Sequence, residues 1–432
     1  MAPFLVCSMS WLARSCRGLR VPRKRSRRAR AALEIATLPD DVLLEIVART
    51  DFFTLIRCAV VCKHLRRDIL SPPFIRRISQ QVAPCIIVDL CTYNKIPLTL
   101  VHPPTRAAAS FCDDRLLPFM SRHAADILRE YNPVTSCHGL FVLIRRPLTV
   151  RGNSNYLHIV TRPESEHNLE LCVYNPMTGQ RTFLAKPPGF HSRMSRSHKY
   201  VLLTSMDGIN DSFMLLFAYC SRWSIRVHVA TTSSSTWEPV PTQVRHHRFP
   251  WWSVELNSDP AVLHSSILHW LTHLGDLIVS YDMSTGMPRP INLLPTNHRA
   301  RQVHLATSSD GNLLKLLTID GYKISVWLQL PTVQTDGGSG DWSLQNVIDV
   351  EEKIWHVCAN IPLGAGTDVV VEFDRFGKRT GDVMLLRVQK KYHHSVLLIL
   401  DLKMNEMHVH MGGSRLLEID LSYHLQTMKV FS

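Results

Sequence analysis

From about residue 136 onward, the sequence is a succession of short apolar segments separated by polar turns. The segments have the length and the Val, Ile, Leu and aromatic content that are typical of β-strands. They are LFVLIRR (140–146), LELCVY (169–174), FMLLFAY (213–219), IRVHVA (225–230), LIVSYD (277–282), KISVWLQL (323–330), DVMLLRV (382–388) and VLLILDL (396–402). Few windows in this part favour a long helix, so the pattern predicts an all-β domain.

The predicted strands also recur in groups. Junctions between strand and turn fall, mostly about fifty residues apart, at Asn175, Thr231, Asp282, Gln329 and Asp401. VYNPMTGQ and SYDMSTGM share a turn that Asn or Asp opens and in which Thr-Gly supplies a residue free to take positive φ. A period near fifty residues predicts a β-propeller, because each blade is one small antiparallel sheet. A β-sandwich or two unrelated β domains is the alternative.

A helical segment precedes the strands, and it has more apolar faces than it can bury alone. It reads LPDDVLLEIVARTDFFTLIRCAVVCKHLRRDI (38–69). The first half predicts an amphipathic helix whose apolar stripe is Val42, Ile46 and Val47, widened by Leu43. The second half is apolar on two faces, Leu55, Ala59, Cys62 and Leu65 on one and Ile56 and Val60 on the other. A unit of about forty residues cannot cover both faces, so either the β domain or a partner protein must cover one.

The charge and the cysteines limit the classes of function. The net charge of +13 lies mainly in residues 1–33, which hold nine Lys or Arg and no acid, so the remaining chain carries only +4. The body therefore does not predict a nucleic-acid groove, and the basic tail reads as a nuclear localisation signal, a transit peptide or a solvated tail. The eleven cysteines are scattered without a CxxC pair, which argues against disulfides and structural zinc and favours a reducing compartment. No apolar run approaches the ~20 residues of a membrane helix.

Motifs of catalysis are missing from the sequence. It contains no GxSxG elbow, P-loop or HExxH, and we predict no catalytic residue, no metal and no cofactor. Cys137 and His138 are adjacent, but neighbours on a strand point to opposite faces, so we expect a structural role for them. A propeller hydrolase stays open as an alternative, because catalytic groups can converge from different blades.

The helical segment resembles an F-box, the motif that docks a subunit onto the Skp-type adaptor of cullin-RING ubiquitin ligases. LPDDVLLEIVAR and LIRCAVVCKHLRR carry the resemblance. Two positions depart from the family pattern, since Thr50 stands where an apolar residue is more usual and Leu65 where Trp is frequent. The resemblance implies adaptor binding by Leu38, Pro39, Val42, Leu43, Ile46, Leu55, Val60, Cys62 and Lys63.

The β region is similar to the F-box-associated β-propellers of plants. SCHGLFVLIRR (136–146) and VYNPMTGQR (173–181) resemble that family's Ser-Cys-Asn-Gly-Leu and Asn-Pro-x-Thr-Gly signatures, with His138 in place of Asn. VLHSSILHWL (262–271) resembles its strand ending in Trp-Leu. The resemblance implies a substrate receptor in which the F-box holds the ligase and the β domain holds the target.

We therefore expect a multidomain chain with a small all-α F-box module followed by an all-β domain. The expected parts are a disordered basic tail (1–33), the F-box module (34–77), a mixed connector (78–135) and a β-propeller-like domain (136–432). The expected function is a non-catalytic substrate-recognition subunit of an SCF-type ubiquitin ligase, in the nucleus or cytoplasm. Its partners would be the Skp-type adaptor, through it a cullin, and a target protein. A nuclear nucleic-acid-associated protein that uses the basic tail is the alternative of a different class.

Overall fold

The computed structural model describes part of the chain. The described residues are 39–50, 54–55, 58–59, 62–81, 85–90, 99–102, 105–146, 148–151, 157–160, 169–188, 198–221, 224–234, 236–240, 260–263, 267–271, 277–293, 302–308, 310–330, 342–359, 369–376, 381–390, 395–410 and 416–420. The expected basic tail (1–33) lies outside them. No helix within these ranges has the length and apolar content needed to cross a bilayer.

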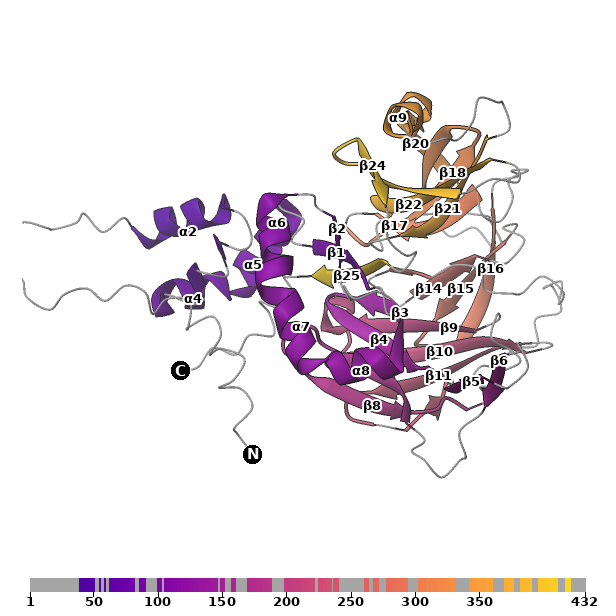
Figure 1. Cartoon of the computed structure of the whole chain (residues 1–432), viewed down its shortest axis with the longest axis horizontal. Coiled ribbons are helices and arrows are strands. Elements are labelled where there is room, and N and C mark those ends of the chain that lie inside the picture. The colour runs from indigo at the N-terminus through magenta and orange to yellow at the C-terminus, as the bar shows by residue number, and fades with distance from the viewer. Residues whose placement is uncertain are drawn as a thin grey trace, which may run out of the picture.

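Six antiparallel sheets form the blades of a β-propeller (Figure 1). The first two blades are β3 (Tyr131–Cys137), β4 (Leu140–Arg145), β7 (Leu169–Tyr174) and β8 (Arg181–Ala185), and β9 (His198–Thr204), β10 (Phe213–Ser221), β11 (Ser224–Thr231) and β12 (Glu238–Pro239). The third is β13 (Ala261–Leu263), β14 (Ile267–Leu271), β15 (Leu277–Asp282) and β16 (Met287–Asn292). The fourth and fifth are β17 (Val303–Thr307), β18 (Leu314–Asp320), β19 (Lys323–Gln329) and β20 (Trp342–Asp349), and β21 (Val369–Phe376), β22 (Val383–Lys390), β23 (Ser395–Asp401) and β24 (Glu406–His410). A separate hairpin consists of β5 (Leu148–Arg151) and β6 (Leu157–Val160).

The all-β fold and the propeller are confirmed, and the predicted turns explain the sharp reversals between strands. Asn175 Oδ1 accepts hydrogen bonds from the backbone N–H groups of Met177 and Thr178, at 2.9 and 3.2 Å. Gly179 then takes the left-handed conformation, with φ of 74°. After β23, Asn405 occupies the corresponding position with φ of 57°, which Asn tolerates better than most residues.

The sixth blade joins the two ends of the propeller. It consists of β1 (Cys85–Asp89), β2 (Thr99–His102) and β25 (Leu416–Asp420). β1 and β25 pair in antiparallel register from Cys85 opposite Asp420 to Asp89 opposite Leu416. The segment expected as a mixed connector (78–135) therefore also supplies two strands of a blade. Sequence periodicity missed this role because the pairing strand lies near the other end of the chain.

Helices connect the sixth blade to the first. They are α6 (Arg106–Phe111), a π-helical turn η2 (Cys112–Leu116), α7 (Leu117–His123) and α8 (Ala125–Glu130). The F-box segment forms α2 (Asp40–Ala48), α4 (Lys63–Ile69) and α5 (Pro72–Gln81), and Thr54–Leu55 and Cys58–Ala59 are also helical. α5 starts at Pro72. The first residue of a helix has no partner for its N–H within the helix, so proline costs no hydrogen bond there.

The F-box helices share one hydrophobic core with the propeller. The cluster of buried side chains runs from Val47 and Leu55 of the F-box through Met120 of α7 to Tyr174 and Ile419 of the first and sixth blades. In Figure 1 these helices lie beside α6 and the closing strands. The β domain thus covers one apolar face of the helical module. This is the first of the two possibilities that the sequence left open, the second being cover by a partner protein.

Two buried histidine–aspartate pairs tie the closing blade to the fifth blade. His102 Nε2 on β2 lies 3.0 Å from Asp401 Oδ2 on β23, and His410 Nε2 on β24 lies 3.6 Å from Asp89 Oδ2 on β1. Burial by itself would raise the pKa of Asp401. The hydrogen bonds from His102 and from backbone N–H groups outweigh that effect and lower its pKa to about 2.

Replacing Leu417 by Ala tests the shared core. Leu417 is 2% exposed on β25 and belongs to that cluster, so the substitution should cost about 2–5 kcal/mol of unfolding free energy through lost burial and a cavity. The matched control is Leu344→Ala, because Leu344 is 47% exposed on β20 and its loss should cost about 0.5 kcal/mol or less. Equal effects in urea unfolding would contradict the shared core.

The Asp401 pair predicts a stability loss in acid. The pKa of Asp401 in the folded chain, about 2, lies below the model-compound value of 3.8, so its stabilisation is complete above about pH 4 and is lost as the pH falls toward 2. In Asp401→Asn, which keeps an oxygen to accept the turn N–H groups, the loss of unfolding free energy over this range should be smaller by about 1–2 kcal/mol. Urea unfolding at stepped pH measures the difference, and identical pH dependence would refute the pair's contribution.

Candidate adaptor-binding site

The helix α2 begins and ends with groups that suit its termini. Pro39 precedes the helix, and its carbonyl accepts the N–H of Leu43 at 3.0 Å. Asp40 and Asp41 stand in the first turn, where negative charge complements the helix dipole. At the other end, the Thr50 hydroxyl donates to the carbonyl of Val47 at 2.8 Å. Thr50, a departure from the F-box pattern, thus satisfies a helix terminus in this chain.

The two faces of α2 differ in burial. Val47 and Ala48 are buried in the shared core, and Leu44 packs against it. On the opposite face, Val42 and Ile46 are 39% and 49% exposed. We call the outward surface formed by Pro39, Val42, Leu43 and Ile46 the adaptor face; Pro39 is exposed and Leu43 is half-buried. The sequence placed Val47 in one stripe with Val42 and Ile46, but the structure turns Val47 inward.

The other residues implied in adaptor binding lie in different surroundings. Leu55 is 1% exposed and packs inside the shared core. Cys62 is half-buried, and Lys63 is exposed at the start of α4. Leu38 and Val60 lie outside the described residues. Among the residues described, Pro39, Val42, Leu43 and Ile46 therefore lie together on the outward side of α2, whereas Leu55 is buried in the shared core.

Ion pairs hold α2 against its neighbouring helices. Arg77 of α5 is hydrogen-bonded to Glu45, which also pairs with Arg49 at 3.0 Å. The hydrogen bond from Arg77 is the main cause that lowers the pKa of Glu45. His64 Nδ1 of α4 lies 3.7 Å from Asp40 Oδ1. Exposed pairs of this kind contribute little stability, but they restrict the orientation of α2.

Leu65, the second departure from the F-box pattern, packs inward. It is half-buried on α4 and contacts the shared core. Leu65 therefore contributes to the shared core. It is not one of the residues of the adaptor face on α2.

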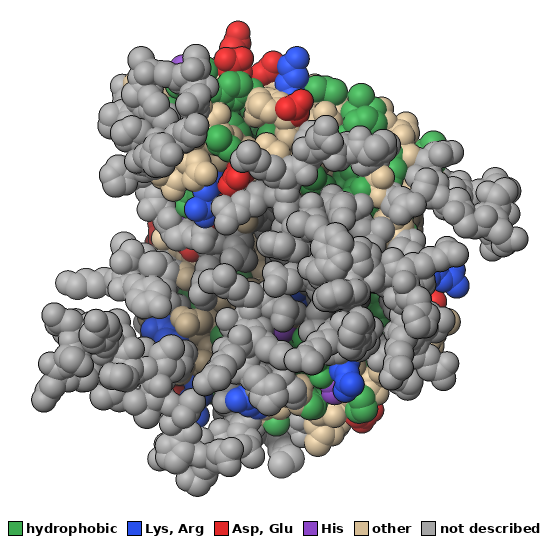
Figure 2. Space-filling model, turned by 90° about the vertical axis from the view of Figure 1, so that its right-hand side faces the viewer, with side chains coloured by type: hydrophobic (Ala, Val, Ile, Leu, Met, Phe, Trp, Pro, Cys, Tyr) green, Lys and Arg blue, Asp and Glu red, His purple; other side chains and the backbone are tan. Residues whose placement is uncertain are grey.

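A second exposed apolar surface lies on the fourth blade. β20 is the outer strand of that blade, and α9 (Glu351–Val357) follows it. Leu344 and Val347 are exposed apolar side chains on β20, and we call them the blade-four surface; Leu330 after β19 and Trp355 on α9 are exposed elsewhere on the blade. Figure 2 shows hydrophobic, acidic and basic side chains together at the top of the molecule, where Figure 1 places α9 and β20. Exposed apolar residues mark an interaction site where they form a contiguous patch.

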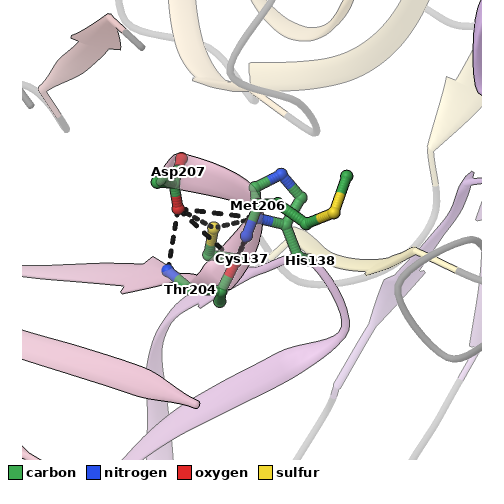
Figure 3. A network of polar contacts seen from close by, with 5 residues as sticks. All are labelled: Cys137, His138, Thr204, Met206 and Asp207. Atoms are coloured by element: carbon green, nitrogen blue, oxygen red, sulfur yellow. Dashed lines mark hydrogen bonds and ion pairs between the residues drawn. The ribbon is translucent and has the colours of Figure 1, made fainter. Parts of the chain in front are cut away.

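A compact polar cluster joins the first two blades (Figure 3). Cys137 ends β3, His138 follows in the β3–β4 turn, and Asp207 lies in the short helix η4 (Ser205–Asp207) after β9. Cys137 Sγ lies 3.1 Å from His138 Nδ1, and Thr204 Oγ1 lies 2.8 Å from the same nitrogen. The expectation that Cys137 and His138 diverge is wrong, because His138 is a turn residue with φ of 46° and not a strand residue.

Comparison with known families decides what kind of protein this is. The F-box domain family matches residues 35–77. The family described as "Domain of unknown function (DUF7595)" matches residues 104–431. The chain belongs to the DUF7595 family. It therefore combines an F-box domain with a DUF7595 β-propeller, and no curated protein matches it.

Solved structures similar to this DUF7595 chain share low sequence identity with it. The β-propeller domain of Cps50 (Swd1) from Myceliophteria thermophila is 10% identical and matches 65% of this chain and 85% of its own, with a TM-score of 0.32. A putative TolB from Agrobacterium tumefaciens is 9% identical over 75% and 87% of the two chains, with a TM-score of 0.33. Oligopeptidase B from Trypanosoma brucei is 13% identical, and the match covers 64% of this chain and 33% of the peptidase, with a TM-score of 0.29. At these scores the likenesses carry no inference about activity.

Proposed function

We propose that this DUF7595 protein is a non-catalytic substrate-recognition subunit of an SCF-type ubiquitin ligase. Its F-box domain would bind the Skp-type adaptor, and through it a cullin, while the propeller holds a target protein for ubiquitination. The observation that carries the proposal is the adaptor face. An F-box helix buries Val47 and Ala48 in the chain's own core and leaves Val42 and Ile46 outward.

The adaptor face has the physical properties of a docking site. Val42 and Ile46 are one helical turn apart, so their side chains form a continuous apolar ridge. A ridge of this kind fits helix-in-groove recognition, in which apolar residues at i and i+4 anchor a helix. The hydrogen bond from Arg77 of α5 to Glu45 joins α2 to a second helix before binding, and such preorganisation lowers the entropy lost on association.

The shared core gives the proposed receptor its geometry. Because the F-box helices and the first blade belong to one core, the propeller would be held close to the F-box. A target bound on the propeller would then be held at a fixed position near the ligase. The rate gain would come from the raised effective concentration of target lysines, with no chemistry in this chain.

The target would bind where the adaptor leaves the propeller free. In Figure 1 β20 lies at the top of the molecule, well apart from α2 at the left, so adaptor and target could be bound together. By analogy with the F-box-associated propellers of plants, which the sequence resembles, we assign target recognition to the propeller and place the complex in the nucleus or cytoplasm.

Charge substitutions on the adaptor face test the proposal. In Val42→Asp/Ile46→Asp, two carboxylates would have to be buried without partners, so we expect the affinity for the Skp-type adaptor to fall by about a hundredfold or more. The matched control is Leu344→Asp/Val347→Asp, which places the same charges on the blade-four surface and should bind the adaptor like the unchanged chain. Isothermal titration calorimetry measures both, with circular dichroism to verify that the helices remain folded. Unchanged affinity in the adaptor-face variant, or no binding by the unchanged chain, would refute the F-box role.

A further inference from the structure

We propose that Cys137, His138 and Asp207 form a binding site for a Zn²⁺ ion that clips the first two blades together. The residues come from the β3–β4 turn and from η4 after β9, so a shared ion would join turns of neighbouring blades (Figure 3). The inference does not depend on the proposed function, and its test requires no adaptor or target.

The ligand atoms suit zinc in type and number. A thiol sulfur, an imidazole nitrogen and a carboxylate oxygen lie within 4.8 Å of one another. Zn²⁺ accepts all three kinds of ligand, whereas Mg²⁺ and Ca²⁺ prefer sites made of oxygen atoms. Three protein ligands leave a fourth position that water can fill. Binding would release the thiol proton, because the thiolate is the ligand.

The distances between these atoms leave room for one ion. Cys137 Sγ, His138 Nδ1 and Asp207 Oδ2 are separated by 3.1, 3.6 and 4.0 Å. A triangle with these sides has its equidistant point about 2.1 Å from each corner, which falls within the ~2.0–2.3 Å of zinc bonds to nitrogen, oxygen and sulfur. Zinc could therefore enter with shifts of a few tenths of an ångström.

The fold holds the ligands in place before any ion binds. Cys137 is 2% and Asp207 is 7% exposed, and Asp207 Oδ2 accepts the backbone N–H of Thr204 at 2.8 Å. His138 takes an unfavourable left-handed conformation for a non-glycine residue, which aims its ring at Cys137 and Asp207. A Cβ at the next residue, Gly139, would lie 3.3 Å from the carbonyl oxygen of Asp420, so the turn is packed tightly against β25.

The geometry distinguishes a metal site from a thiol-hydrolase triad. In a triad, the nucleophile and the orienting carboxylate contact opposite nitrogens of the imidazole. Here Cys137 Sγ and Asp207 Oδ2 both lie near Nδ1 of His138, at 3.1 and 3.6 Å. Thr204 Oγ1 lies 2.8 Å from the same nitrogen, so an ion at this point would replace that hydrogen bond and take Cys137, His138 and Asp207 as ligands.

Cobalt titration of the full chain tests the proposal. After dialysis against a chelator, Co²⁺ should bind with a stoichiometry of one at this site and give a thiolate-to-cobalt charge-transfer band, which Zn²⁺ then abolishes. His138→Asn is the sharpest variant, because Asn tolerates the left-handed turn but lacks the imidazole. Asp207→Asn keeps an oxygen that can accept the Thr204 N–H while it removes the charge.

The expected result is the loss of the charge-transfer band in Cys137→Ala and a fall in Co²⁺ affinity of about a hundredfold or more in His138→Asn and Asp207→Asn. Cys358→Ala is the matched control, because Cys358 is a buried thiol in a separate core cluster. The charge-transfer band should remain in this variant. Zn²⁺ should also raise the melting temperature of the unchanged chain and of Cys358→Ala, but not of His138→Asn. The proposal fails if the unchanged chain gives no such band, or if the band persists in Cys137→Ala.

Discussion

Pairing between β1 and β25 brings the two ends of the propeller into one sheet, and the position of the F-box helices depends on it. β1 enters the closing blade directly after α5, the last F-box helix, so closing the ring also fixes the F-box against the propeller. The same blade is joined to the fifth by the buried pairs of His102 with Asp401 and of His410 with Asp89. Such contacts between distant parts of a chain form only when the whole domain folds, since their closure entropy is large and local contacts cannot replace them.

The helical module uses its two apolar faces differently. Its inner face, which includes Val47 and Leu55, belongs to the propeller's core, while Val42 and Ile46 face outward. A free helical unit of this size would be marginally stable because it buries little surface, and attachment to the first and sixth blades removes that weakness. This division lets an apolar ridge stay exposed without loss of the fold. It also suits a protein whose function we propose to be holding two partners at a fixed separation.

Local patterns in the sequence predicted the strands, the turns and the F-box because each depends on neighbouring residues. The turn at Asn175 and Gly179 follows from side-chain hydrogen bonding and glycine geometry, and the structure contains it as predicted. The sixth blade was missed because β1 lacks a local sign of its partner β25. The sequence shows Cys137 beside His138 but gives no sign of Asp207, since Asp207 comes from the next blade and spacing rules for metal sites do not cover such distances. The left-handed turn at His138, where the related signature has Asn, was the one local sign available.

The central claim is that the adaptor meets the outward face of α2 while the rest of the module stays joined to the propeller. Hydrogen–deuterium exchange on the full chain, with and without the Skp-type adaptor, tests it most directly. The account predicts slower exchange of the α2 backbone amides on binding and no change in β3 and β4 beneath the module. Protection of the propeller strands with unchanged α2, or faster exchange in the blades that share the core, would contradict it.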